Sequence, residues 1–240
     1  MFVIRNLYGS SRIRGMKILA LETATDPGSI ALWVDGEVWS TTCPDGESNS
    51  ASLLPAVSRA LSTHGLDFSD IDGIAFGAGP GSFTGLRVSC GVAQGLAVAR
   101  DLLLLGVGTL EAMAHSAVAE RVLVVLDARM GEIYYGFFMH GQQHGQIGVC
   151  APEQMPLPEG EGWLACGNGL SAYPVLKERL SGCVDNWRPE IMPNAAAIAR
   201  IAARRFAAGE RIDPADAAPV YVRDKVAKTV VERLAEGGRA

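Results

Sequence analysis

The chain has 240 residues, of which 48% are hydrophobic and 20% are charged, so it carries enough apolar material for one large or two small globular domains. Its formal net charge of −5 argues against a protein that holds a nucleic acid by itself, because phosphate groups are bound by clustered Lys and Arg. The five cysteines are widely spaced and lack a C-x-x-C pair, so we predict neither a disulfide framework nor a zinc site. The apolar runs are far shorter than the about 20 residues that span a bilayer, so we predict no membrane span and expect a cytoplasmic protein.

Three strands are predicted near the start of the chain. They follow residues 1–15, which lack the apolar core of a secretory signal and which we interpret as an N-terminal extension. The first strand covers 17–21 and is rich in apolar residues. The next two, 29–34 and 37–41, flank Asp35-Gly36, a dipeptide typical of a two-residue hairpin turn.

Two helices and two strands complete the first half of the chain. Apolar residues recur at helical spacing in the first helix, which ends before Gly65, and these residues are Leu53, Leu54, Val57 and Leu61. A strand at 72–77, a helix at 86–99 and a strand at 103–107 follow.

A glycine-rich loop separates the strand at 72–77 from the helix at 86–99. Its glycines Gly79, Gly81 and Gly85 permit close approach of the backbone, and Ser82 and Thr84 add hydroxyl groups. Backbone N–H groups at a helix N-terminus can hold a phosphate, whereas the alternative is a turn that lets the helix pack tightly on a sheet. The loop lacks the Lys of a P-loop, the third glycine of a dinucleotide fingerprint and the flanking glycines of a nucleophile elbow.

The second half of the chain repeats the opening pattern. An apolar strand at 122–127, a polar turn and a strand at 132–139 echo the first strands, as expected of a duplicated unit. Glu22 and Asp127 stand at equivalent ends of the two echoing strands, where open α/β sheets place ligand-contacting groups. Each carboxylate could orient a magnesium–nucleotide complex, or could accept N–H bonds within its own turn.

The remaining segments give weaker signals. We expect a surface loop at 141–162, which places His140 and His144 in a solvated turn rather than in a metal site. Asn194 is a suitable cap for a helix that ends before Gly209. A last helix is predicted at about 225–235. No catalytic or metal-binding role is assigned to any histidine.

Small residues line the helix at 86–99. Ser89, Ala93 and Ala97 recur every four positions, and such a stripe allows another helix to approach closely, either inside the fold or across a subunit interface. We predict that this stripe forms a dimerising surface. The apolar residues assigned to the same surface on the first helix are Leu53, Leu54, Val57 and Leu61.

Four segments resemble the bacterial TsaB (YeaZ) family. They are, in chain order, "MKILALETAT", "GAGPGSFTGLRVSCGVAQGLA", "LDARMGEIYYG" and "PVYVRDKVA". The resemblance implies an α/β protein with the duplicated ribonuclease H-like fold of actin and Hsp70-like ATPases, in two α/β subdomains. We place these at 16–107 and 108–240, with the last helix packing back on the first.

The family resemblance also implies a function and partners. Family members form a heterodimer with a catalytic paralogue, TsaD, and with the ATPase TsaE they support threonylcarbamoyl transfer to the adenosine beside the anticodon of tRNAs that read ANN codons. The paralogue's metal-binding H-x-x-x-H pair matches Thr109 and Met113 here. We therefore expect a non-catalytic subunit that contacts tRNA only through the complex, forms a homodimer when alone, requires no cofactor and binds ATP or ADP with magnesium weakly at most.

Two rival functions from other classes stay open at this point. One is a glycoprotease-like peptidase, a label that has been attached to this branch of the superfamily. The other is a small independent kinase of the actin-like superfamily, although the chain is short and shows no evident substrate domain. The family usually has a histidine where Asn49 stands, so nothing catalytic is inferred from that segment.

Overall fold

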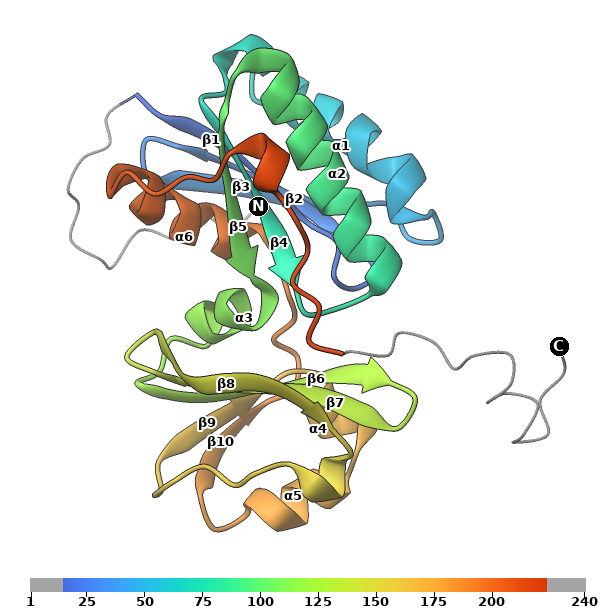
Figure 1. The fold of residues 1–240 in the computed structure, drawn as a ribbon, viewed down its shortest axis with the longest axis vertical. Coiled ribbons are helices and arrows are strands. Elements are labelled where there is room, and N and C mark those ends of the chain that lie inside the picture. The colour runs from blue at the N-terminus through green and yellow to red at the C-terminus, as the bar shows by residue number, and fades with distance from the viewer. Residues whose placement is uncertain (1–14, 224–240) are drawn as a thin grey trace, which may run out of the picture.

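Two five-stranded sheets with the same strand order form the two subdomains of the chain (Figure 1). The computed structural model describes residues 15–223. The first subdomain comprises the sheet β1–β5 with helices α1, α2 and α6, and the second comprises the sheet β6–β10 with helices α4 and α5. Helix α3 lies between the two sheets. In the described part of the chain, no helix is both long enough and apolar enough to cross a membrane.

The first sheet has the order β3-β2-β1-β4-β5, with β1–β2 and β2–β3 antiparallel and β1–β4 and β4–β5 parallel. Its strands are β1 (Lys17–Glu22), β2 (Ser29–Val34), β3 (Glu37–Thr42), β4 (Gly73–Gly79) and β5 (Leu103–Gly108). Helices α1 (Asn49–Thr63) and α2 (Phe83–Arg100) lie side by side on one face, and α6 (Ala195–Ala207) covers the other (Figure 1).

The second sheet repeats this topology when it is read from β8 to β10. Its order is β8-β7-β6-β9-β10, with two antiparallel pairs followed by two parallel pairs. Its strands are β6 (Arg121–Arg129), β7 (Glu132–Met139), β8 (Gln142–Cys150), β9 (Trp163–Cys166) and β10 (Val184–Arg188). The short helices of this half are α4 (Gly169–Ala172), α5 (Val175–Leu180) and the single 3-10 turn η2 (Pro152–Gln154).

The repeated topology confirms the predicted fold class, a duplicated ribonuclease H-like fold with two α/β subdomains. The predicted hairpin is also confirmed, because Asp35 and Gly36 adopt φ angles of 51° and 96° between β2 and β3. Two further 3-10 turns, η1 (Phe68–Asp70) and η3 (Pro214–Asp216), lie in connections of the first subdomain.

Helices α3 (Thr109–Ala117) and α6 join the two halves of the chain. Asn194 caps α6 by accepting a hydrogen bond from the N–H of Ala197 at 2.9 Å, as predicted, and donates to Ser116 Oγ of α3 at 3.1 Å. Helix α6 packs on β1 and β2 through Ile198 and Ile201, so it is an exception to the predicted division at residue 108. Helix α6 packs there because it buries the apolar face of the first sheet that α1 and α2 leave uncovered.

Three secondary-structure predictions need comment. The predicted loop at 141–162 was wrong over the nine residues of β8, whose five exposed first residues hide the strand pattern. Helix α2 begins at Phe83 rather than at 86, because Ser82 caps it and brings Thr84 and Gly85 into its first turn. The helix predicted at about 225–235 lies outside the described residues.

The small-residue stripe of α2 faces the core of the first subdomain. Ser89, Ala93 and Ala97 have no exposed surface, and Ser89 Oγ donates a hydrogen bond to the carbonyl of Gly77 at 3.3 Å. The stripe therefore brings α2 close to its own sheet, and the prediction that these residues form a dimerising surface was wrong. Spacing locates a stripe on a helix, but it does not say which side of the helix meets the sheet.

The prediction for α1 fails for the same reason at three of its four residues. Leu53, Val57 and Leu61 are buried in the core that α1 and α2 share with β1 and β4. Leu54 is 48% exposed and remains available to a partner. Any docking surface on these helices must therefore be built from their opposite faces.

We predict that Ala93→Arg unfolds the chain rather than blocking a complex. The substitution would bury a long cation without a partner, and we expect the free energy of unfolding to fall by more than about 4 kcal/mol. Ala99→Arg, on the exposed side of the same helix, is the matched control and should change it by less than about 0.5 kcal/mol. Urea unfolding followed by circular dichroism measures both, and a stably folded Ala93→Arg protein would contradict the assigned orientation of α2.

Candidate functional site

The glycine loop packs directly against the β1–β2 connection. A Cβ atom on Gly85 would lie 1.8 Å from the carbonyl oxygen of Thr23, and one on Gly81 would lie 2.5 Å from Cβ of Ala24. Two hydrogen bonds join the loops: Thr23 Oγ1 donates to the carbonyl of Gly85 at 2.6 Å, and the N–H of Ser82 donates to Ala24 at 2.8 Å. Both glycines are thus required by close packing, which is the alternative to phosphate binding.

The amide donors of this loop are partly used within the protein. Ser82 Oγ accepts from the N–H of Gly85 at 3.3 Å, which caps α2, while the N–H of Ser82 is bound to Ala24. Gly79 has a φ angle of 116°, and a Cβ atom on it would lie 2.6 Å from the carbonyl oxygen of Val220. The loop therefore supports another segment of the same chain at Gly79.

Glu22 ends β1 as a buried carboxyl group. It lies over Gly77, where a Cβ atom would come within 2.3 Å of Glu22 Oε2, so the glycine makes room for the acid. Oε1 accepts a hydrogen bond from the N–H of Ala24 at 2.5 Å, and Oε2 has no partner within the described residues. Burial raises the pKa of Glu22 to about 7, although its hydrogen bonds with Ala24 and Thr23 act in the opposite direction.

Asp127 occupies the equivalent end of β6 and lies at the surface of the cleft. Its Oδ1 accepts hydrogen bonds from the N–H of Arg129 at 2.9 Å and from Tyr173 Oη at 3.0 Å. The N–H of Asp127 donates to Asn168 Oδ1 at 2.9 Å. The carboxylate thus bonds to its own turn and to Tyr173, which follows α4.

Asn49 fastens the β1–β2 connection to α1, a role that sequence reasoning missed. Its Oδ1 accepts from the N–H of Gly28 at 3.0 Å, and its Nδ2 donates to Asp26 Oδ1 at 2.8 Å. Gly28 has no room for a side chain, because a Cβ atom would lie 2.4 Å from Asn49 Oδ1. Asn49 therefore holds the β1–β2 connection in place on α1.

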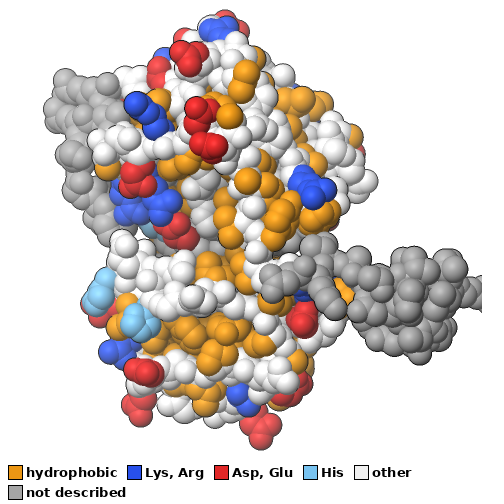
Figure 2. All heavy atoms as spheres, viewed as in Figure 1, with side chains coloured by type: hydrophobic (Ala, Val, Ile, Leu, Met, Phe, Trp, Pro, Cys, Tyr) orange, Lys and Arg blue, Asp and Glu red, His pale blue; other side chains and the backbone are white. Residues whose placement is uncertain are grey.

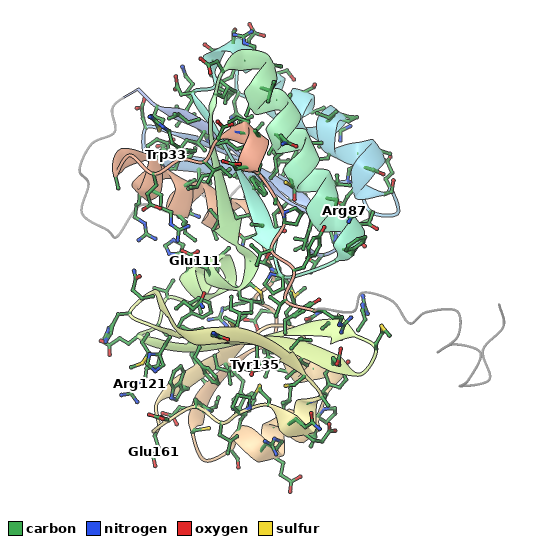
Figure 3. All side chains as sticks on the ribbon, viewed as in Figure 1. Trp33, Arg87, Glu111, Arg121, Tyr135 and Glu161 are labelled. Atoms are coloured by element: carbon green, nitrogen blue, oxygen red, sulfur yellow. The ribbon has the colours of Figure 1, made fainter. Side chains whose placement is uncertain are left out.

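A C-terminal segment crosses from the first subdomain to the second and was not predicted as part of the site. We call residues 219–223 the strap. The N–H of Val220 donates to the carbonyl of Ala78 at 2.6 Å. Tyr221 lies beside Phe83 with ring centroids 5.4 Å apart. Arg87, which Figure 3 shows on α2, donates from Nε to Tyr221 Oη at 2.9 Å. The only sequence signal for this segment was its place in the family resemblance.

The strap ends on the second subdomain. Arg223 forms an ion pair with Glu132 and donates from Nη2 to the carbonyl of Ala128 at 3.2 Å. Its guanidinium carbon lies 5.9 Å from the centroid of the Tyr134 ring. A cavity of about 370 Å³ remains between the subdomains and is lined by the strap together with Asp26, Gly81, Ser82, Asp127, Arg129 and Asn168.

Thr109 and Met113, which the family resemblance matches to a metal-binding pair, lie in the interior. Thr109 and Met113 of α3 have no exposed surface, and Thr109 Oγ1 is without a hydrogen-bond partner in the described part of the chain. Met113 belongs to the core between α3 and the second sheet. Among residues 15–223, no three side chains of His, Cys, Asp or Glu gather in a way that could hold a metal ion.

The four histidines stand apart from the cleft. His64 stacks on Trp39 with ring centroids 4.4 Å apart, His140 lies in the β7–β8 turn, and His144 pairs with Phe137 in β8. His115 lines a separate crevice between α3, α6 and the β7–β8 turn. Burial, with Arg204 and Arg200 nearby, lowers the pKa of His115 to about 4.

That crevice has charged walls of both signs (Figure 2). Arg205 Nη2 lies 2.7 Å from Glu111 Oε1, and Arg205 Nε lies 3.8 Å from Glu210 Oε2. These ion pairs connect α6 to α3 and to the segment that follows α6. The crevice is therefore the junction between α3 and α6.

We predict that Glu22→Gln changes how stability depends on pH. The folded chain holds the Glu22 proton more tightly than the unfolded chain does. The free energy of unfolding therefore falls as pH rises from about 4.5 to about 7. Glutamine cannot lose this proton, so the variant should gain up to about 3 kcal/mol relative to the parent between pH 4.5 and pH 8. Urea unfolding at both pH values measures the difference, with the exposed Glu37→Gln as control. A stability difference that does not vary with pH would contradict the buried, proton-holding state of Glu22.

Comparison with known proteins identifies the family. The family model described as TsaD, tRNA N6-adenosine threonylcarbamoyltransferase, matches residues 47–150. The tRNA threonylcarbamoyladenosine biosynthesis protein TsaB of Escherichia coli K12 is 40% identical over 88% of this chain and 96% of its own length, and that of Haemophilus influenzae is 31% identical over 89% and 96%. A crystal structure of a protein similar to the peptidase YeaZ from Pseudomonas aeruginosa has a TM-score of 0.79 and 34% identity, covering 87% of this chain and 100% of that one. The chain belongs to the TsaB family.

Proposed function

We propose that this chain is a non-catalytic subunit in the biosynthesis of threonylcarbamoyladenosine in tRNA, and that it works in the cytoplasm. Its support is the 40% identity with a protein of that biosynthesis over nearly the full length of both chains. In this proposal it binds a TsaD-like catalytic paralogue, acts with a TsaE-like ATPase, and meets tRNA only within the assembly. The tRNAs are those that read ANN codons.

One observation carries the non-catalytic role. Thr109 and Met113, at the positions of the paralogue's metal-binding pair, lie in the core with no exposed surface. A hydroxyl and a thioether are poor ligands for a hard catalytic metal, and neither reaches the cleft. Glu22 and Asp127 do not replace them, because Glu22 is buried and Asp127 is bound by its own turn and by Tyr173.

The cleft also fits a tightly bound nucleotide poorly. The strap covers the glycine loop at Gly79, and the N–H of Ser82 is already bound to Ala24. The cation at the start of α2, Arg87, donates to Tyr221 rather than pointing to an open phosphate position. We therefore propose that the chain needs no cofactor and binds ATP or ADP with magnesium weakly, if at all.

The outer faces of α1 and α2 are the proposed docking surface. Gly91 and Gly95 lie one turn apart on the exposed side of α2, with open space at each Cβ position, so nothing in the subunit requires a glycine there. Interior helical glycine costs about 1 kcal/mol relative to alanine. Leu54 and Val98 are 48% and 66% exposed, and Figure 2 shows hydrophobic side chains at the surface over α2.

The charge of this surface indicates the chemistry of the partner. Helices α1 and α2 carry Arg59, Arg87 and Arg100 and no acidic residue, although the whole chain has a net charge of −5. A partner helix with small or apolar residues along its centre and carboxylates at its edge would complement this face. A second copy of this chain would meet it with like charges at the edge, so we propose that the paralogue binds more tightly than a homodimer forms.

The peptidase and kinase alternatives lack support from the described residues. A metallopeptidase needs a metal site, and no group of three or more suitable ligands is found in residues 15–223. A kinase needs an open nucleotide cleft and a bound phosphate, whereas the strap lies across the loop in this cleft. Neither of these alternatives is proposed.

Reconstitution tests the proposed function. The catalytic paralogue and the ATPase are supplied with threonylcarbamoyl adenylate, ATP and unmodified tRNA, and modified nucleoside is measured with and without this chain. We expect product only when the chain is added, and no product from the chain alone. Full activity without it would overturn the proposal, and so would product formed by this chain in the absence of the paralogue.

We predict that Gly95→Arg blocks docking without unfolding the subunit. The Cβ position is open in the isolated chain, so the thermal midpoint should stay the same or rise, because arginine favours a helix more than glycine does. A bulky cation between two closely packed helices should weaken binding of the paralogue at least 100-fold, which corresponds to about 2.7 kcal/mol.

The matched control for this test is Ala207→Arg, an exposed position in α6 on the opposite face of the sheet. It should leave binding unchanged. Biolayer interferometry against the immobilised paralogue gives both affinities. Undiminished binding of the Gly95→Arg protein would place the interface away from the outer face of α2.

A further inference from the structure

The strap joins the two subdomains where they face each other across the cleft. On the first subdomain it is held by the Val220 N–H bond to Ala78 and by Tyr221 beside Phe83 and Arg87. On the second it is held by Arg223, whose side chain is only 16% exposed. A segment bound to both sides of a cleft does what a bridging ligand does, because each side can move away only if contacts with the segment break.

Gly79 is adapted to the strap. Its φ angle of 116° belongs to a region that residues with side chains rarely adopt, and a Cβ atom would lie 2.6 Å from the carbonyl oxygen of Val220. The strap's backbone therefore rests on the glycine loop at a position where only glycine leaves room. This contact uses the same freedom from side chains that lets other glycine loops approach a phosphate.

The two anchors of the strap differ in character. Tyr221 is 44% exposed and forms one side of a stack in which the guanidinium of Arg87 lies 3.8 Å from the centroid of the Phe83 ring. Arg223 is mostly covered and makes a charge-assisted bond with Glu132 as well as a bond with the carbonyl of Ala128. Within the described residues, loss of both anchors leaves the contact of Val220 with Ala78 and Gly79 and the packing of Val222 against the core of the second subdomain.

We propose that the strap is an internal ligand of the cleft, which excludes nucleotide by occupying the surface of the glycine loop and which holds the two subdomains at one relative position. The cavity that remains beside it has a volume of about 370 Å³ and is lined by strap residues along one side. Weak nucleotide binding then results from an occupied cleft and not from the lack of a cation alone. The inference concerns the isolated chain, so it stands whether or not a paralogue docks on α1 and α2.

The test uses the full chain with Tyr221→Ala and Arg223→Ala combined. Hydrogen–deuterium exchange of the amides at 78–86 and at 128–134 reports release of the strap on both subdomains. Calorimetry with magnesium and a non-hydrolysable ATP analogue reports access to the cleft. We expect amide exchange at least tenfold faster at both segments, and binding of the ATP analogue at least tenfold tighter than in the parent chain.

Two controls keep this test specific. Arg188→Ala removes an exposed ion pair with Glu190 away from the cleft and should change neither measurement. Arg223→Lys with Tyr221 intact keeps a cation near Glu132, so its amide exchange should stay as slow as in the parent chain. Faster exchange without tighter binding would overturn the exclusion of nucleotide, and unchanged exchange in the double variant would overturn the bridging role. Micromolar binding by the parent chain with exchange at the strap unaltered would also overturn the proposal.

Discussion

The close packing of the glycine loop on the β1–β2 connection is the constraint on which the rest of this structure depends. At Gly85 the approach leaves less space than any side chain needs, since a Cβ atom would lie 1.8 Å from the carbonyl oxygen of Thr23. The approach allows Ser82 to bond to Ala24 and to cap α2. It thereby fixes the start of the long helix whose inner face completes the core and whose outer face is open to a partner.

The same packing determines what the cleft can do. Because the glycine loop packs against its neighbour, it presents fewer free amide groups to an anion. At Gly79 the loop supports the chain's own strap. Glu22 and Asp127, which stand at the ends of the duplicated strands, are respectively buried and bound within a turn. The polar groups at the ends of these strands are thus used for holding the structure together.

The local features of this chain were predictable where a short sequence pattern has one structural solution. Asp35-Gly36 and the cap Asn194 are of this kind, and the echo between the two halves predicted the duplicated sheets correctly. Features set by long-range contacts were not predictable. The stripe Ser89, Ala93 and Ala97 was recognised, but its direction depends on a sheet assembled from distant strands, and β8 was missed because its exposed first half lacks an apolar alternation.

The site was predictable to a similar extent. The sequence pointed to two loops that the structure brings to one cavity, because glycines and terminal carboxylates mark the ends of parallel strands. It could not show that residues near position 220 return to a loop near position 80, since no local pattern encodes a contact across 140 residues. Nor could it distinguish a glycine needed for a ligand from one needed for a neighbouring loop, because both uses demand the same absence of a side chain.

The central claim is that the chain acts through the outer face of α1 and α2 and not through chemistry in its cleft. The most direct measurement is the rate of tRNA modification in the reconstituted system with a Glu22→Gln, Asp127→Asn double variant that remains folded by circular dichroism. The account predicts a rate within about twofold of the parent chain, because neither carboxylate takes part in the chemistry. A twofold change corresponds to only about 0.4 kcal/mol of transition-state stabilisation. A fall of 100-fold or more, with binding of the paralogue unchanged, would show that the cleft takes part in the chemistry and would contradict the account.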